Sequence, residues 1–511
     1  MRLLDCTLRD GGYYTRWDFD RELVKVYLES MNKLPVDYLE VGYRNTELRG
    51  YYGEYYFCPV STLMWMKSIT NKRLAVILNE KDVHVENVHS LLTPIQPYIE
   101  LVRMAVDPAN FLRALKTAKV IKEIGFEVAF NVMYMSKWAE YPEMMKNLSL
   151  LDGTVDYFYL VDSYGGVFPD EVKSTLAEVK ANTNAQIGFH GHDNLEMALA
   201  NTLAAAENEI DIVDATITGM GRGAGNLRME LLLTVLNSRY GIDIDFNALS
   251  EVTGAFQDLQ GAYGWGTSLP YMVSGANSLP QKEVMEWVSK RYYSLNSIIR
   301  ALGNRSKGVK DTESFIVFKP EKYFDRVLVI GGGPTAKSHD DAVARFLNDN
   351  PDMPIVHASS KNAMAYTGIK NPQYFCLVGN EGVRLEKVFQ SLKSFSGQCI
   401  LPPFPREMGT YVPVPLREKT CELDCVSFTK IRSDSHTAIA LQSALFLRAH
   451  TAYFVGYDGY SGAVIAEKDQ ELFAENSRLF EDAMNAGLKC ISLTPTRYTA
   501  LISSNVYQHI S

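Results

Sequence analysis

The sequence lacks several features that mark specialised protein classes. Its 511 residues contain no apolar run near the roughly 20 residues that a membrane helix needs, and no internal repeat or low-complexity tract. Cysteine is scarce, with seven residues scattered along the chain. Positive charge is in deficit, because 51 lysines and arginines face 60 aspartates and glutamates, for a formal net charge of −9.

These absences exclude several classes of function. The negative balance argues against general attraction to nucleic acid or anionic membranes. The odd cysteine number, and an N-terminus (MRLLDCTLRDGG) without a signal-peptide run, lead us to expect a cytoplasmic protein with reduced thiols. Hydrophobic residues at 46% and charged residues at 22% are typical of a globular protein.

What is present is a repeated alternation of short apolar runs and helix-length amphipathic stretches. Parallel strands with right-handed crossovers follow from such alternation. Eight units favour a (β/α)₈ barrel, with a doubly wound sheet as the alternative. The eight runs are residues 3–8, 38–43, 74–78, 98–106, 127–134, 157–162, 187–190 and 212–217.

We therefore expect an α/β protein with three parts. Residues 1–240 would form the TIM barrel, 241–315 a helical extension, and 320–511 a second, Rossmann-like α/β domain. In the last part, the strand-like residues 327–330 lead into Gly-Gly-Gly-Pro, without the full Gly-x-Gly-x-x-Gly spacing of a dinucleotide site. Its role stays open between phosphate binding and a structural or oligomerisation role.

The segment GFHGHDN (residues 188–194) is the strongest local signal for chemistry. Residues two apart in a strand point to one face, so His190 and His192 can present two imidazoles to one metal ion. The alternative is a pair of surface histidines with no ligand. A barrel places its active site at the carboxyl ends of its strands, where this segment lies.

Two further segments follow strands 1 and 8, which are neighbours in a closed barrel. TLRDGG (residues 7–12), read as a turn after the first strand, offers the Asp10 carboxylate and the Arg9 cation. GMGRGAGN (residues 219–226) offers the Asn226 amide oxygen; a phosphate-binding turn is its alternative. Two nitrogen and two oxygen ligands favour a divalent ion, with Mn²⁺ first and Mg²⁺, Co²⁺ or Zn²⁺ as alternatives.

With these motifs in order, residues 1 to about 300 resemble the DRE-TIM metallolyase (HMGL-like) superfamily. The segments YLEVGY (38–43) and VDSYG (161–165) add to the resemblance. It implies that Asp10, His190 and His192 bind the metal, with Asn226 as a further ligand. It also implies that the metal holds a 2-oxoacid, that Arg9 stabilises an enolate oxygen, and that Glu40 orients Arg9.

Within that superfamily, the chain most resembles the 4-hydroxy-2-oxovalerate (4-hydroxy-2-oxoacid) aldolases. The glycine-rich loop after strand 8 lacks the cysteine of hydroxymethylglutaryl-CoA lyase and the Glu-Arg pair of the Claisen synthases, but it fits the aldolase pattern. One departure stands out. Tyr13 and Tyr14 occupy the region where those aldolases carry a histidine base. Tyr13 is our candidate for the catalytic role there, with a pocket wall as the alternative.

We therefore predict a metal-dependent aldolase, a carbon–carbon lyase that joins or releases pyruvate and an aldehyde. The alternatives are an acyl-CoA-dependent Claisen condensing enzyme and an inactive barrel that serves as a scaffold or binding module. The expected partner is a small-molecule 2-oxoacid, without nucleic acid or membrane. The resemblance leaves open a homo-oligomer and an aldehyde dehydrogenase partner.

Overall fold

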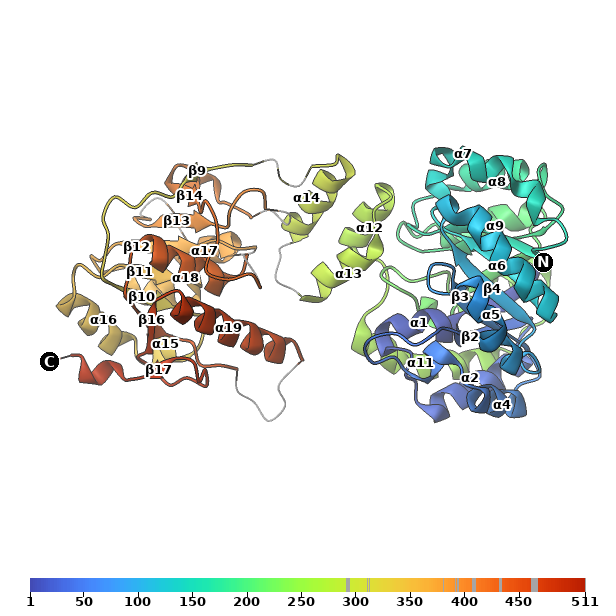
Figure 1. Ribbon diagram of the computed structural model, residues 1–511, viewed down its shortest axis with the longest axis horizontal. Helices are drawn as coiled ribbons and strands as arrows, with labels where there is room; N and C mark the ends of the chain where they lie inside the picture. The colour runs from blue at the N-terminus through green and yellow to red at the C-terminus, as the bar shows by residue number, and fades with distance from the viewer. Residues whose placement is uncertain are drawn as a thin grey trace. The chain divides into compact units, whose positions relative to one another are not determined.

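The computed structural model describes the chain except residues 291–294, 310, 312, 380, 391, 393–394, 407–409, 432–433, 461–466 and 511. The chain divides into two compact units, Met1–Met285 and Glu286–Ser511, and both are α/β (Figure 1). Within the described residues, no helix combines the length and the apolar character needed to cross a membrane.

In the first unit, eight parallel strands close into a barrel, which confirms the predicted fold. Strand β1 pairs with β2 on one side and with β8 on the other, so the ring closes in sequence order. The strands are β1 (Arg2–Asp5), β2 (Tyr38–Tyr43), β3 (Arg73–Asn79), β4 (Leu101–Val106), β5 (Glu127–Val132), β6 (Tyr157–Asp162), β7 (Gln186–Gly191) and β8 (Ile212–Ala215).

Amphipathic helices alternate with these strands. In the second helix, the Asp20 side chain caps the first turn by accepting two backbone N–H groups. Val24, Tyr27, Leu28 and Met31 then recur on one buried face. The helices of this unit are α1 (Thr7–Thr15), α2 (Arg21–Lys33), α3 (Glu54–Phe57), α4 (Val60–Ile69), α5 (Val85–Leu92), α6 (Phe111–Ile124), α7 (Pro142–Lys146), α8 (Pro169–Lys180), α9 (Ala198–Glu207), α10 (Met229–Tyr240), α11 (Phe246–Tyr263) and α12 (Leu269–Ala276).

The first strand ends earlier than the apolar pattern predicts. Strand β1 stops at Asp5, whose carboxylate accepts the backbone N–H of Thr7 at 2.8 Å and its hydroxyl at 3.0 Å. Such a local side-chain bond competes with strand pairing and favours a helix start. Helix α1 begins at Thr7, so Arg9 and Asp10 lie in a helix rather than in the expected turn.

The second unit contains a nine-stranded, fully parallel sheet of order β17-β16-β15-β10-β11-β12-β13-β14-β9. Its strands are β9 (Ile316–Val317), β10 (Arg326–Ile330), β11 (Ile355–His357), β12 (Gln373–Cys376), β13 (Gln398–Leu401), β14 (Thr420–Glu422), β15 (Thr451–Val455), β16 (Lys489–Ser492) and β17 (Ile502–Ser503). Its helices are α14 (Leu295–Ser306), α15 (Thr335–Ser338), α16 (Asp340–Asp349), α17 (Glu381–Phe389), α18 (His436–Phe446) and α19 (Glu467–Asn485); α13 (Gln281–Lys290) spans the division between the units.

The strand order of this sheet reverses between β10 and β15, as in a Rossmann-like fold. The glycine turn that follows β10 lies against the Asp458 side chain, which accepts the backbone N–H of Thr335 at 3.0 Å. A Cβ atom on Gly333 would lie 2.7 Å from the Asp458 carboxylate. The Asp458 carboxylate therefore accepts the first backbone N–H of the short helix α15.

Candidate active site

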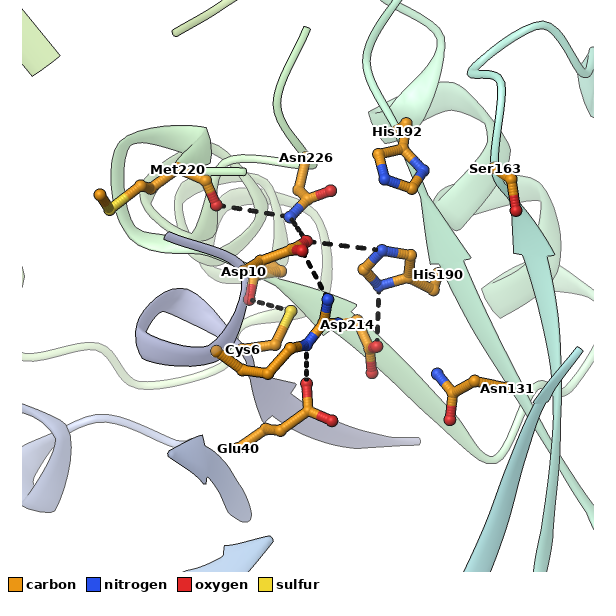
Figure 2. Close-up of polar contacts among 12 residues, drawn as sticks. Cys6, Asp10, Glu40, Asn131, Ser163, His190, His192, Asp214, Met220 and Asn226 are labelled. Carbon is orange, nitrogen blue, oxygen red and sulfur yellow. Dashed lines mark hydrogen bonds and ion pairs between the residues drawn. The ribbon is translucent and has the colours of Figure 1, made fainter. Parts of the chain in front are cut away.

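Three titratable side chains from two parts of the barrel meet at the carboxyl ends of its strands. Asp10 comes from helix α1, His190 from strand β7, and His192 from the residue after Gly191, where β7 ends. One ligand-capable atom of each lies within 4.8 Å of those of the other two (Figure 2). All three side chains are buried. This arrangement has the spacing that a single metal ion requires.

Hydrogen bonds fix how the two imidazoles point. The Nδ1 atom of His190 lies 2.9 Å from the Asp214 carboxylate, and the Nδ1 atom of His192 lies 2.8 Å from the backbone carbonyl of Asp162. Because each partner is an acceptor, Nδ1 donates the hydrogen bond in both rings, and Nε2 is the ring nitrogen left to bind a ligand. Metal-binding histidines are held in this way, with the far nitrogen bonded to an oxygen.

Neighbouring charges and burial shift the pKa values of His192 and Asp10 toward the forms that bind metal. Burial, together with the neighbouring His190, lowers the pKa of His192 to about 3, so its ring is neutral. Burial by itself would raise the pKa of Asp10, but the Arg9 guanidinium and the two imidazoles outweigh it and bring that pKa to about 2. A neutral imidazole and an ionised carboxylate are the forms that bind metal.

Asn226 completes the set of ligand-capable groups. Its Nδ2 atom donates to Asp10 at 2.5 Å and to the Met220 carbonyl at 3.4 Å. Its Oδ1 atom is buried and has no hydrogen-bond partner among the described residues. A buried amide oxygen without a partner is costly unless a ligand occupies it. The donor set of two nitrogens and two oxygens therefore fits a divalent cation.

Arg9 lies beside this cluster with its guanidinium held on two sides. Its Nε donates to Glu40 at 2.7 Å, and its Nη1 donates to Asp10 at 2.5 Å. Glu40 comes from the second strand and is fully buried. A guanidinium with two carboxylate partners is rigid and pre-oriented, as stabilisation of a developing anion requires.

Sequence reasoning missed a buried network below the cluster. Arg103 on β4 is fully buried, donates to Asp214 at 2.5 Å and to Asn131 at 3.0 Å, and lies 3.1 Å from Glu40. Arg103 thereby links Glu40, which binds Arg9, to Asp214, which binds His190. The sequence does carry a signal for this network, because each of two apolar runs contains one charged residue: Arg103 in LVRMAV and Asp214 in IVDA.

The tyrosines at the positions of the expected histidine lie on helix α1, shortly after Asp10. The hydroxyls of Tyr13 and Tyr43 are 3.0 Å apart, and the guanidinium of Arg222 lies over the Tyr13 ring, 4.7 Å from its centroid. Tyr14 instead donates to the Gly223 carbonyl at 3.3 Å and packs against Trp265. The two adjacent tyrosines therefore have different surroundings.

The barrel is similar to several known proteins. The HMGL-like family model matches residues 1–254. The 4-hydroxy-2-oxovalerate aldolase of Thermomicrobium roseum is 32% identical over 242 residues, covering 46% of this chain and 66% of that protein. The aldolase of the same name from Roseiflexus castenholzii is 30% identical, covering 50% of this chain and 75% of that protein.

Two more proteins match a longer stretch of the chain than the family model does. The oxaloacetate decarboxylase of Mycobacterium tuberculosis is 25% identical over 319 residues, covering 60% of this chain and 92% of that protein. The solved N-terminal domain of a candidate aldolase from Bacteroides vulgatus is 53% identical with a TM-score of 0.57, covering 59% of this chain and all of that domain. The chain therefore belongs to the HMGL-like family of lyases.

Proposed function

We propose that the barrel is a metal-dependent aldolase acting on 4-hydroxy-2-oxoacids. In the cleavage direction, the bond between C3 and C4 of the substrate breaks, the C4 hydroxyl loses its proton, and C3 gains one. Pyruvate and an aldehyde result, and addition is the reverse. The observation that carries this proposal is the cluster of Asp10, His190, His192 and Asn226 beside the fixed Arg9 guanidinium. The names of the relatives supply the substrate class.

Asp10, His190, His192 and Asn226 would hold the divalent cation, Mn²⁺ by preference, which would polarise the keto group of the 2-oxoacid as a Lewis acid. The donors match it because both imidazoles present Nε2 and the Asn226 carbonyl has no other partner in the described chain. Burial of the cluster excludes water and strengthens these interactions.

Arg9 stabilises the negative charge that develops on the oxygen of the pyruvate enolate. Its guanidinium is held in place by Glu40 and Asp10, so little reorganisation is needed as the charge forms. Lysine would not substitute well, because only the guanidinium fork can satisfy two carboxylates and still face a third group.

Tyr13 moves the proton of the substrate hydroxyl at C4. It lies on helix α1 four residues after Arg9, on the same face, and its hydroxyl shares a hydrogen bond with Tyr43. In this proposal Tyr13 takes the place of the histidine that the family's aldolases carry.

Exchange of the pyruvate methyl protons tests the proposal. The full-length protein is incubated with Mn²⁺ and pyruvate in D₂O, and the methyl signal is followed by NMR. We expect metal-dependent exchange that is lost in Asp10→Asn and Arg9→Ala. Exchange should be kept in the control Asp193→Asn, because the wild-type Asp193 carboxylate accepts the backbone N–H of Ala198 and is not a proposed metal ligand. Absence of exchange with Mn²⁺, Mg²⁺, Co²⁺ and Zn²⁺ would refute the proposal, and CoA release from acetyl-CoA with a 2-oxoacid would favour the Claisen alternative.

A further inference from the structure

Arg222 differs from the other two arginines of the site in its partners. Arg9 and Arg103 each contact two carboxylates. The Arg222 guanidinium, by contrast, makes no hydrogen bond or ion pair within the part of the chain that the structure describes, although its side chain is half-buried. A cation withdrawn from water without a carboxylate partner is unfavourable, so its presence needs a reason.

The surroundings of Arg222 keep it charged and ready to bind an anion. Burial opposes the charge, but nearby Tyr13, Asp10 and Tyr43 raise the pKa of Arg222 above its usual value. The Tyr13 ring supports the guanidinium from one side. The N–H donors of the Arg222 guanidinium are therefore available to bind a ligand.

The loop that carries Arg222 is anchored next to it. The carbonyl of Gly223 accepts the hydroxyl of Tyr14 at 3.3 Å, and the N–H of Ala224 donates to Gln281 at 3.2 Å. A Cβ atom on Gly223 would lie 2.2 Å from the Gln281 side chain, and the residue has a φ of +69°. The backbone is thus held by neighbouring elements, which lowers the entropy lost when the guanidinium binds a ligand.

The position of Arg222 relates it to one end of the proposed substrate. Asp10 and Arg9 mark the 2-oxoacid end, whereas the Arg222 guanidinium lies over the ring of Tyr13, which follows Arg9 by about one turn of helix α1. One helical turn has an axial rise of roughly 5.4 Å, which is comparable to the length of a short carbon chain. A group bound by Arg222 would belong to the aldehyde portion of the substrate, beyond the C4 hydroxyl that Tyr13 contacts.

We propose that Arg222 binds a second oxyanion, a carboxylate or a phosphate, at the end of the substrate's aldehyde portion. The enzyme then prefers acceptor aldehydes that carry a terminal negative charge over neutral ones. This inference rests on the proposed aldolase function, which it deepens by naming the substrate class. Bidentate donation to a carboxylate or phosphate is the geometry for which arginine is suited.

Acceptor selectivity tests this inference. Addition of pyruvate to propanal, succinic semialdehyde and glyceraldehyde 3-phosphate is measured with Mn²⁺ present, and the last two distinguish carboxylate from phosphate. We expect kcat/KM to favour at least one anionic acceptor over propanal by about 10- to 100-fold. Arg222→Met removes that preference, Arg222→Lys restores part of it, and Arg239→Met, at an exposed arginine paired with Glu207, leaves it intact.

Two further readouts separate this inference from the proposed function. Pyruvate methyl exchange needs no acceptor, so Arg222→Met keeps it. Its loss in that variant would place Arg222 at the 2-oxoacid end and overturn the inference. Binding of succinic semialdehyde is followed by quenching of Trp17, whose ring lies 4.9 Å from that of Tyr13. If the wild type bound or used anionic and neutral aldehydes equally, the inference would fail even with exchange intact.

Discussion

The imidazole of His190 and the carboxylate of Asp214 lie 2.9 Å apart, Nδ1 to Oδ2, in the buried part of the barrel. The same carboxylate oxygen lies 2.5 Å from Arg103. Asp214 therefore orients a proposed metal ligand while its own charge is balanced, and the Arg103 guanidinium helps to hold its pKa below the usual range despite burial.

Asp214→Asn tests this relationship. The amide keeps the shape of the side chain but removes the charge that orients and polarises His190, so we expect Mn²⁺ affinity to fall by about 10- to 100-fold. Titration calorimetry measures the affinity, and circular dichroism checks the fold. Asp193→Asn is the matched control, since Asp193 bonds to a backbone N–H and not to an imidazole. Equal Mn²⁺ affinity in the two variants would contradict the positioning role.

Gly221→Ala tests whether Asn226 belongs to the proposed metal site. A Cβ atom at position 221 would lie 2.4 Å from Nδ2 of Asn226, so the amide must move away from Asp10. We expect weaker Mn²⁺ binding in an otherwise folded protein. The control is Gly254→Ala on helix α11, where a Cβ atom meets nothing within 4 Å and the helix gains about 0.5–1 kcal/mol. Unchanged Mn²⁺ binding in the Gly221 variant would remove Asn226 from the ligand set.

Tyr13→Phe separates proton transfer at C4 from enolate formation. We expect the rate of 4-hydroxy-2-oxoacid cleavage to fall by about 100-fold or more, as loss of a general acid–base group does. The exchange of pyruvate methyl protons should persist, because it involves no C4 hydroxyl. Tyr14→Phe, which removes a hydroxyl bonded to the Gly223 carbonyl, should keep most of the cleavage rate. Parallel loss of exchange and cleavage in Tyr13→Phe would assign Tyr13 a different role.

Asp5 makes stability depend on pH in a defined window. Burial raises the pKa of Asp5 to about 7, against hydrogen bonds from Tyr27 and Thr7 that lower it. Between about pH 4 and 7, the folded state keeps a proton that the unfolded chain has lost, so the free energy of unfolding decreases as pH rises. Above about pH 7 this loss is complete. Its size is a few kcal/mol, since each unit of pKa difference is worth about 1.4 kcal/mol.

Urea unfolding at several pH values measures this dependence. Relative to Asp5→Asn, which has no carboxyl group to titrate, the wild type should lose stability from pH 4 to 7. Tyr27→Phe removes the hydrogen bond that stabilises the carboxylate and should extend the loss to higher pH. A constant difference between wild type and Asp5→Asn across this range would show that the Asp5 pKa is not raised.

The amino-acid sequence by itself determined the barrel and which of its motifs lie close together at the strand ends. Eight alternating units were visible because strand and helix periodicities are local properties of the chain. Ring closure then brings the end of the first strand beside that of the eighth, so Asp10 and Asn226 meet, and the two-residue spacing of His190 and His192 puts them on one face.

Only the tertiary structure decided how these groups are held. Helix α1 begins at Thr7 because the Asp5 side chain takes backbone and hydroxyl bonds that no periodicity reveals. Arg103 joins Glu40 to Asp214 across strands that are distant in sequence, and the stacking of Arg222 on Tyr13 depends on the folded loop after β8. Such contacts arise from the register of the closed barrel and the packing of its loops, so they become visible only once the chain has folded.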